Sequence, residues 1–149
     1  MPARFPRRLN KSDYERLAAL RFQLRRFLRF SEVEAKTVGL TPRQYQGLLV
    51  VAGYPGRDEI TVGELAAQLL IAHHSAVGLV DRLCAQGLVE RKPGPVDRRQ
   101  VFVRLTVRGS AVLEELAHTH QAELLKLGPK ISDLLRTLEG AAAASASNR

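Results

Sequence analysis

The sequence lacks tryptophan, has five phenylalanines and three tyrosines, and contains a single cysteine, Cys84. One cysteine cannot form an intrachain disulfide, which excludes a disulfide-stapled scaffold and favours a reducing compartment. The longest strongly apolar run, LLVVA at 48–52, is far too short to span a bilayer. The basic start MPARFPRRLNK is not followed by the apolar segment of a secretory signal. We therefore expect a cytoplasmic protein that has no membrane partner.

What the sequence does contain is an excess of positive charge. The 149 residues carry a formal net charge of +8 at pH 7, and 45% of them are hydrophobic, which is enough for one domain with a real core. The excess is concentrated in residues 1–30 and 82–109. Such a charge favours a polyanionic partner, either nucleic acid or an anionic membrane surface.

Three capping boxes mark helix starts in the first half of the chain. The first is Ser12 to Glu15, which predicts a helix to about residue 36. The second is Thr41 to Gln44, which predicts a helix to about residue 52, and the third is Thr61 to Glu64. The short helix after Thr61 is followed closely by another helical pattern at 72–87, which Gly87 can terminate. Two short helices joined by a tight link predict a helix-turn-helix.

After Gly87 the periodicity changes to that of strands. Residues 88–92 and 101–106 predict a β-hairpin whose loop spans about 93–99. Thr106 can then cap a long helix, which Gly128-Pro129 should break or kink and which should end near Leu138.

The stretch IAHHSAVGLVDRLC at 71–84 has the residue types of a catalytic or metal site. On a helix, however, His73 and Cys84 lie about 16 Å apart along the axis, and His74 and Asp81 about 10 Å apart. None of the histidines has a ligand-type residue at i+4. We therefore expect no catalytic residues, no metal site, no cofactor and no enzymatic activity.

Helical projection sorts the same stretch into two faces. One arc is apolar and should pack on the domain: Ala72, Ala76, Leu79, Val80 and Leu83. The opposite arc holds His74, Ser75, Gly78, Asp81 and Arg82, with His73 and Val77 at its margin. Hydrogen-bonding side chains at the start of the second helix of a helix-turn-helix are what reading the major groove requires. The alternative is a solvated polar face.

The hairpin loop carries Asp97, Arg98 and Arg99. An arginine on such a loop can enter a narrow minor groove, and Asp97 can hold it by a bidentate pair. The alternative is a charged surface turn. Cys84 falls at the edge of the buried arc. Two roles are compatible with this position, a structural thiol and a redox sensor.

At this point the sequence resembles the multiple-antibiotic-resistance regulator (MarR) family. The resemblance rests on four segments: Leu79-Val80-Asp81-Arg82-Leu83, Gly87-Leu88-Val89, Pro95-Val96-Asp97-Arg98-Arg99, and Leu105-Thr106 with Gly109. It implies a mainly α fold with a small β-hairpin wing, a winged helix-turn-helix, whose N- and C-terminal helices form a dimerisation region. It also implies that residues 72–87 form the recognition helix and that Asp97 and Arg99 belong to the wing.

The resemblance leads us to expect a sequence-specific, homodimeric repressor that binds double-stranded DNA at an inverted repeat. The DNA-binding residues would be His73, His74, Ser75, Val77, Gly78, Arg82, Asp97, Arg98 and Arg99. A small aromatic or anionic effector could release the DNA, and Tyr45 and Arg25 could line its pocket. The alternatives are a redox-responsive regulator that uses Cys84 and a membrane-surface or partner-binding module that uses the basic N-terminal helix.

Apolar residues in both terminal helices outnumber what one buried face needs, which independently favours a dimer: Phe22, Phe27, Leu28 and Phe30, then Leu124, Leu125, Leu127, Leu134 and Leu135. The expected organisation is a basic arm at 1–11, one domain at 12–138 and a flexible tail at 139–149. Within that domain the DNA-binding lobe spans about 41–106, and the dimerisation helices span about 12–36 and 107–138.

Overall fold

The computed structural model describes residues 8–146, so residues 1–7 of the expected arm and 147–149 of the expected tail lie outside the described part. The elements in chain order are α1 (Lys11–Thr37), α2 (Pro42–Gly53), β1 (Glu59–Thr61), α3 (Val62–Leu69), α4 (His73–Ala85), β2 (Val89–Pro93), β3 (Val101–Leu105) and α5 (Val107–Ala146). The chain forms two compact units. Residues 32–119 make the central unit, and residues 8–31 with 120–146 make the helical unit.

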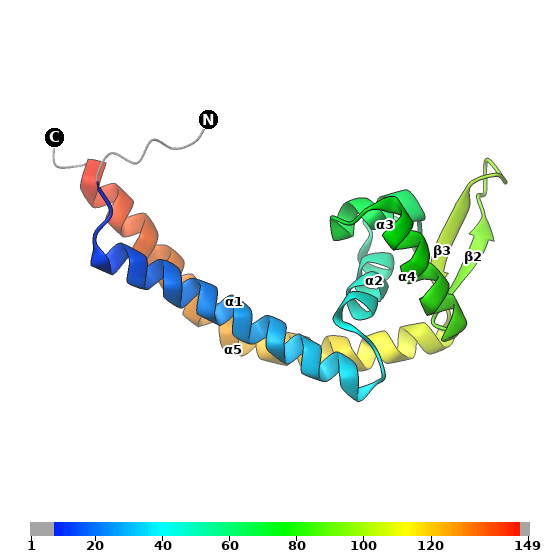
Figure 1. Ribbon diagram of the computed structural model, residues 1–149, viewed down its shortest axis with the longest axis horizontal. Helices are drawn as coiled ribbons and strands as arrows, with labels where there is room; N and C mark the ends of the chain where they lie inside the picture. Colours follow the sequence, from blue (N-terminus) through cyan, green and yellow to red (C-terminus); the bar gives the residue numbers. More distant parts are fainter. Residues whose placement is uncertain (1–7, 147–149) are drawn as a thin grey trace. The chain divides into compact units, whose positions relative to one another are not determined.

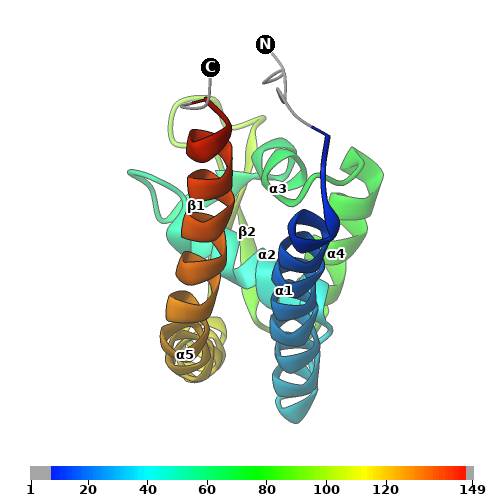
Figure 2. The ribbon, with the colours of Figure 1, turned by 90° about the vertical axis from the view of Figure 1, so that its left-hand side faces the viewer.

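The central unit combines three short helices with an antiparallel sheet of strand order β1-β3-β2. Figures 1 and 2 show α2, α3 and α4 gathered beside the β2–β3 hairpin. The register pairs Val89 with Leu105 in the hairpin and Ile60 with Val103 on the other side of β3. The predicted hairpin is confirmed. Strand β1 was not predicted, because three residues are too few to show an alternating pattern.

A single aliphatic core fills the central unit. Its fully buried side chains include Leu48 and Val51 from α2, Leu65 from α3, Leu79, Val80 and Leu83 from α4, and Ile60 and Val103 from the sheet. Gly47 lets α2 approach α4, because a Cβ there would lie 3.2 Å from Leu79 Cδ2. Leucine and valine thus replace the scarce aromatic residues as the filling of this unit.

The predicted caps of the central unit are confirmed. Thr41 and Thr61 each accept a hydrogen bond from the backbone N–H three residues later, and Gln44 and Glu64 accept one back. Gly87 has a φ of +70° and follows α4, as a helix-ending glycine should. Thr106 Oγ1 accepts the Gly109 N–H at 3.0 Å and so caps α5.

The predicted capping box at Ser12 and Glu15 is wrong. Helix α1 begins two residues earlier than that box requires, at Lys11, so Asn10 is its cap. Asn10 Oδ1 accepts the Asp13 N–H at 3.1 Å, and Asp13 Oδ2 accepts the Asn10 N–H at 2.8 Å. Both pairs have the same spacing, and the Asn10–Asp13 pair adds two residues, about half a turn, to the helix.

The expected break at Gly128-Pro129 is also wrong, because α5 runs through Pro129 and past Leu138 to Ala146. A proline inside a helix leaves the carbonyl four residues earlier, that of Leu125, without its helical donor. The Leu125 side chain is 74% exposed, so water can reach this part of the helix. The alanines at 141–144 have high helix propensity and favour the longer helix.

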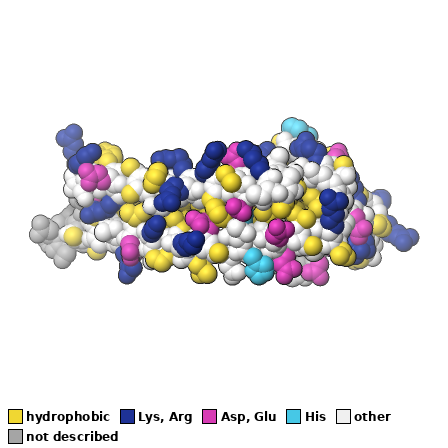
Figure 3. Space-filling view, turned by 90° about the horizontal axis from the view of Figure 1, so that it is seen from below, with side chains coloured by type: hydrophobic (Ala, Val, Ile, Leu, Met, Phe, Trp, Pro, Cys, Tyr) yellow, Lys and Arg dark blue, Asp and Glu magenta, His cyan; other side chains and the backbone are white. Residues whose placement is uncertain are grey.

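The helical unit is held together by a buried contact between its two helices. His120 is buried, and its Nε2 lies 2.8 Å from Ser31 Oγ. The rings of Phe27 and Phe30 meet the imidazole edge to face at 6.0 and 5.4 Å between centroids. Other apolar side chains of this unit remain exposed: Leu17, Phe22, Leu24, Leu28, Leu124, Leu125 and Leu135. On the face drawn in Figure 3, hydrophobic side chains lie between Lys and Arg side chains.

Gly109 provides a test of the central unit. A Cβ at this position would lie 1.9 Å from the Leu88 carbonyl oxygen, which is backbone and cannot move aside cheaply. We predict that Gly109→Ala lowers the free energy of unfolding by about 3 kcal/mol, measured by urea denaturation. Gly63→Ala is the control, since its Cβ would meet only Thr61 Oγ1 at 3.9 Å, and it should change stability by less than about 1 kcal/mol. Equal effects of the two substitutions would contradict the close approach at Gly109.

Candidate nucleic-acid interface

The buried and the exposed residues of α4 lie almost where the helical projection predicts them. Ala76, Leu79, Val80 and Leu83 are buried in the core. Ala72 was assigned to the buried face, and this is wrong: it is exposed, because it is the N-cap residue and precedes the helix. The packing face of α4 therefore begins at Ala76.

The opposite face of α4 is open to solvent along its first three turns. His73, His74 and Arg82 are exposed, and Ser75, Val77 and Gly78 are half-buried. A Cβ at Gly78 would have no neighbour closer than the Arg82 guanidinium at 3.8 Å. The absent side chain at Gly78 thus leaves room for close approach to the helix backbone beside the Arg82 side chain.

Asp81, on the same side of α4, is engaged within the protein. Its carboxylate forms an ion pair with the Arg91 guanidinium from β2. Arg91 Nη1 also lies 3.5 Å from Cys84 Sγ, and Cys84 is half-buried at the edge of the core. Arg91 therefore ties the outward face of α4 to the first strand of the hairpin. Sequence reasoning missed it, because a pair between a helix and a strand leaves no local spacing signal.

The loop between β2 and β3, residues 94–100, is closed by two backbone hydrogen bonds. The Gly94 N–H donates to the Gln100 carbonyl at 2.8 Å, and the Gln100 N–H donates to the Asp97 carbonyl at 3.1 Å. A Cβ at Gly94 would lie 2.4 Å from the Asp97 carbonyl oxygen, so this turn needs glycine. Pro93 is accommodated as the last residue of β2, which is an edge strand of the sheet.

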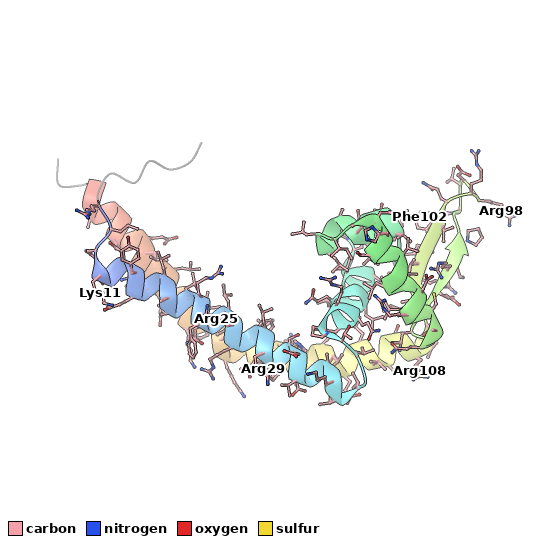
Figure 4. The ribbon with its side chains drawn as sticks, in the orientation of Figure 1. Lys11, Arg25, Arg29, Arg98, Phe102 and Arg108 are labelled. Carbon is pink, nitrogen blue, oxygen red and sulfur yellow. The ribbon has the colours of Figure 1, made fainter. Side chains whose placement is uncertain are left out.

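Asp97 and Arg99 form the bidentate pair that the sequence predicts. Arg99 Nε lies 3.2 Å from Asp97 Oδ1, and Arg99 Nη2 lies 3.4 Å from Oδ2. The Arg99 backbone N–H also donates to Oδ1 at 3.0 Å. The Arg99 side chain is nevertheless 93% exposed. Arg98 projects from the end of the same hairpin (Figure 4), so the loop presents two arginines to solvent.

The hydrogen bonds around Asp97 set its acidity. The pKa of Asp97 lies below its ordinary value of 3.8, chiefly because of the Arg99 backbone N–H and secondly because of the Arg99 side chain. The carboxylate therefore stays charged, and the pair stays intact, throughout the neutral and mildly acidic range.

A second arginine that sequence reasoning missed, Arg57, fixes the start of α3 against the sheet. Arg57 Nη2 lies 2.5 Å from Glu64 Oε1, and Glu64 belongs to the cap of α3. The guanidinium lies 4.8 Å from the centroid of the Tyr54 ring and 5.8 Å from that of Phe102 on β3. Like Arg91, it joins segments that are not neighbours in the sequence.

The histidine side chains of the described residues do not form a metal-binding cluster. Within residues 8–146 there is no group of three or more His, Cys, Asp or Glu side chains that could hold a metal ion. His118 Nε2 lies 3.8 Å from Glu114, on the same helix. In the same described range, no helix is long and apolar enough to cross a membrane. Two alternatives stay predictions: that Cys84 responds to oxidants, and that the basic α1 binds a membrane surface.

The two expected effector-pocket residues lie in different units: Tyr45 is buried in the central unit, where burial raises its pKa, and Arg25 is exposed on α1 of the helical unit. The central unit itself contains an open cleft of about 420 Å³. Its walls include Val38, Leu40, Leu88 and Val112, and the Arg108 side chain, labelled in Figure 4, also lines it. Neither Tyr45 nor Arg25 lines this cleft.

The central unit is a winged helix. It has a helix-turn-helix formed by α3 and α4, directly followed by a hairpin, with the third strand, β1, immediately before α3. The helix-turn-helix places α4 as its second helix, the one that enters the major groove in proteins of this class.

Comparison with known proteins agrees with this class. A model of the MarR family matches residues 38–100. The uncharacterized HTH-type transcriptional regulator YsmB of Bacillus subtilis (strain 168) is 31% identical over 96 residues, which cover 63% of this chain and 62% of YsmB. The multiple antibiotic resistance protein MarR of Escherichia coli (strain K12) is 41% identical over 56 residues, 38% of this chain and 39% of that protein. This chain therefore matches less than two thirds of the length of either relative.

Two solved structures extend the likeness to both units. A crystal structure of mutant MarR from E. coli complexed with operator DNA has a TM-score of 0.63 and 26% identity, covering 83% of this chain and 88% of that chain. AbsC, a MarR family transcriptional regulator from Streptomyces coelicolor, has a TM-score of 0.71 and 21% identity, covering 93% of this chain and 97% of that chain. The chain is therefore similar to MarR family transcriptional regulators in both sequence and fold.

The Asp97–Arg99 pair predicts how the Asp97 carboxyl titrates. We expect the Asp97 carboxyl, followed by NMR, to titrate below its ordinary pKa of 3.8. Because the folded pKa is lowered, the stabilisation from this pair is present above the ordinary pKa and disappears as pH falls through the folded pKa. Arg99→Ala should raise the Asp97 pKa only partly, since the backbone N–H remains. A pKa that does not change in this variant would show that the side-chain pair does not form.

Proposed function

We propose that this protein is a sequence-specific DNA-binding regulator that places α4 in the major groove and the β2–β3 loop in an adjacent minor groove. The observation that carries the proposal is the difference between the two faces of α4. One face is buried in the core, while the other presents His73, His74 and Arg82 to solvent. The proposal is supported by the E. coli MarR mutant structure, which was solved with operator DNA.

The chemistry of this face suits base edges. Imidazole, hydroxyl and guanidinium groups of His73, His74, Ser75 and Arg82 can donate or accept hydrogen bonds, and an arginine can bind guanine O6 and N7 together. Val77 supplies an apolar surface for a thymine methyl group. Gly78 keeps the helix backbone close to the bases.

The hairpin loop supplies the minor-groove contacts in this proposal. Arg98 projects from its end, and Arg99 is held in a defined direction by Asp97 while remaining exposed. An arginine already held in place loses less conformational freedom on binding than a mobile one. The negative potential of a narrow minor groove then favours its insertion.

Binding can be tested by titrating duplex DNA from the region upstream of the gene while the salt concentration is varied. We expect a preference over random duplex and a steep linear fall of log affinity with log salt concentration. Arg99→Ala should weaken binding about tenfold and reduce the salt slope by about one, while the melting temperature falls by no more than about 4 °C, as expected for the loss of an exposed ion pair.

The matched control is Lys36→Ala, which removes an exposed cation from the end of α1 and should leave specific binding unchanged. The absence of both a salt dependence and a preference over random duplex would overturn the proposal. Loss of folding in Arg99→Ala would instead make the loop arginine structural.

We further propose that the protein acts as a homodimer through the helical unit. The unit leaves apolar side chains uncovered, among them Leu125 at 74%, Leu28 at 59% and Phe22 at 53% exposure. A groove of about 430 Å³ runs along α5, lined by Leu124, Leu127, Ile131 and Leu135 among others. A second copy would bury this surface and place two α4 helices on half-sites about one helical turn apart.

Leu125→Arg tests the dimer. We expect it to convert the protein to a monomer in sedimentation equilibrium at micromolar concentration, because a charge in an apolar interface has no partner. Leu49→Arg is the control, since Leu49 is 44% exposed on α2 of the central unit, and it should leave the oligomeric state unchanged. A wild-type monomer at these concentrations would exclude the dimer.

As the action on transcription we propose repression by occupancy of promoter DNA, with release by a small aromatic or anionic effector. The cleft of the central unit supports this ligand class, because apolar walls lie beside the Arg108 guanidinium. Ala85 and Gln86, at the end of α4, also line the cleft. An occupant would therefore contact the helix that reads the DNA.

A further inference from the structure

Leu70 lies in the turn between α3 and α4 and combines two unfavourable features. Its φ of +54° and ψ of +44° are left-handed, and it is the only non-glycine residue of the described range 8–146 with a positive φ. Its side chain is 91% exposed. A left-handed backbone crowds the Cβ of any L-residue against the carbonyl oxygen, and an exposed leucine gains nothing from burial. Glycine would remove both disadvantages.

The turn itself requires this backbone conformation. The Leu70 N–H donates to the Ala67 carbonyl at 3.3 Å, and the Ile71 N–H donates to the Ala66 carbonyl at 3.0 Å. These two bonds close the end of α3 and are typical of a left-handed helix end, where glycine is the usual residue. The folded chain therefore dictates the conformation at residue 70 but gives no reason for a leucine side chain.

The position of Leu70 supplies such a reason. The Cα of His73, the first residue of α4, is three residues away and so within about 11 Å. Ala72, His73 and His74 are all exposed, as Leu70 is. An uncovered isobutyl group therefore stands beside the end of α4 from which the proposed major-groove contacts begin.

We propose that Leu70 contacts DNA, packing its side chain against an apolar edge of the duplex, a thymine 5-methyl group or a deoxyribose, next to the start of α4. This inference rests on the proposed DNA-binding function. The polar residues of α4 read hydrogen-bonding groups, and Leu70 adds an apolar contact in front of the helix, separate from the one proposed for Val77. The leucine is unfavourable in the free protein and becomes favourable when DNA covers it.

Leu70→Gly separates this role from a structural one. Because the substitution relieves the left-handed strain, the melting temperature should equal or exceed that of the wild type, by up to about 4 °C. Affinity for the specific duplex should nevertheless fall about tenfold, because the apolar contact is lost. Any purely structural role would move stability and affinity in the same direction.

Two further variants keep the test independent of glycine flexibility. Leu70→Asn tolerates the left-handed conformation but is polar, so it should bind as weakly as Leu70→Gly. Leu70→Met keeps an apolar side chain and should retain wild-type affinity. Val107→Ala is the control for loss of an exposed aliphatic group, since Val107 is 90% exposed at the start of α5, and it should leave affinity unchanged.

Replacing thymines of the bound duplex with deoxyuridine distinguishes the two apolar edges. If one replacement weakens the wild type but not Leu70→Gly, the contact is to a thymine methyl; if none does while Leu70→Gly still binds weakly, the contact is to deoxyribose. Equal affinity of wild type and Leu70→Gly would overturn this inference alone. A wild-type protein that binds no duplex specifically would overturn the proposed function itself.

Discussion

The central unit depends on the surroundings of one backbone carbonyl, that of Leu88. It accepts the Thr106 N–H at 3.1 Å, and the Gly87 carbonyl beside it accepts the Thr106 hydroxyl at 2.6 Å. The same hydroxyl oxygen accepts the Gly109 N–H, and Gly109 has no side chain to displace Leu88. At this point the end of α4, the start of β2, the end of β3 and the start of α5 are joined. The register of the hairpin, with Val89 opposite Leu105, follows from the same junction.

This junction explains why two of the segments that carry the family resemblance contain glycine at fixed places. Gly87 supplies the positive φ that ends α4, and Gly109 supplies the space that lets α5 start against Leu88. Neither touches the proposed DNA surface. Their contribution is to fix the direction in which the hairpin leaves α4, and the Asp81–Arg91 pair fixes the same relation from the outward side.

Much of the fold was predictable because its signals are local. The caps at Thr41, Thr61 and Thr106 depend on residues three apart, and the Asp97–Arg99 pair joins residues two apart. The Asn10 cap was missed because Ser12 and Glu15 offer the same spacing, so local sequence alone does not choose between them. Other features are set by long-range contacts: β1 exists only because β3 pairs with it, and Arg57 and Arg91 find their partners across the fold. The strain at Leu70 follows from the tight closure of α3, which no periodicity reveals.

The residues that stabilise the central unit and those proposed to contact DNA are therefore largely separate. Leu79, Val80 and Leu83 are fully buried and hold α4 in place, whereas His73, His74 and Arg99 are exposed and contribute little to folding. Selection for stability alone would leave the exposed set undetermined and would favour glycine at position 70. Leu70 is exposed and has a left-handed backbone, so its side chain is unfavourable in the free protein. In our proposal this cost is offset only in the complex with DNA, whereas each polar residue on α4 is compatible with solvent in the free protein.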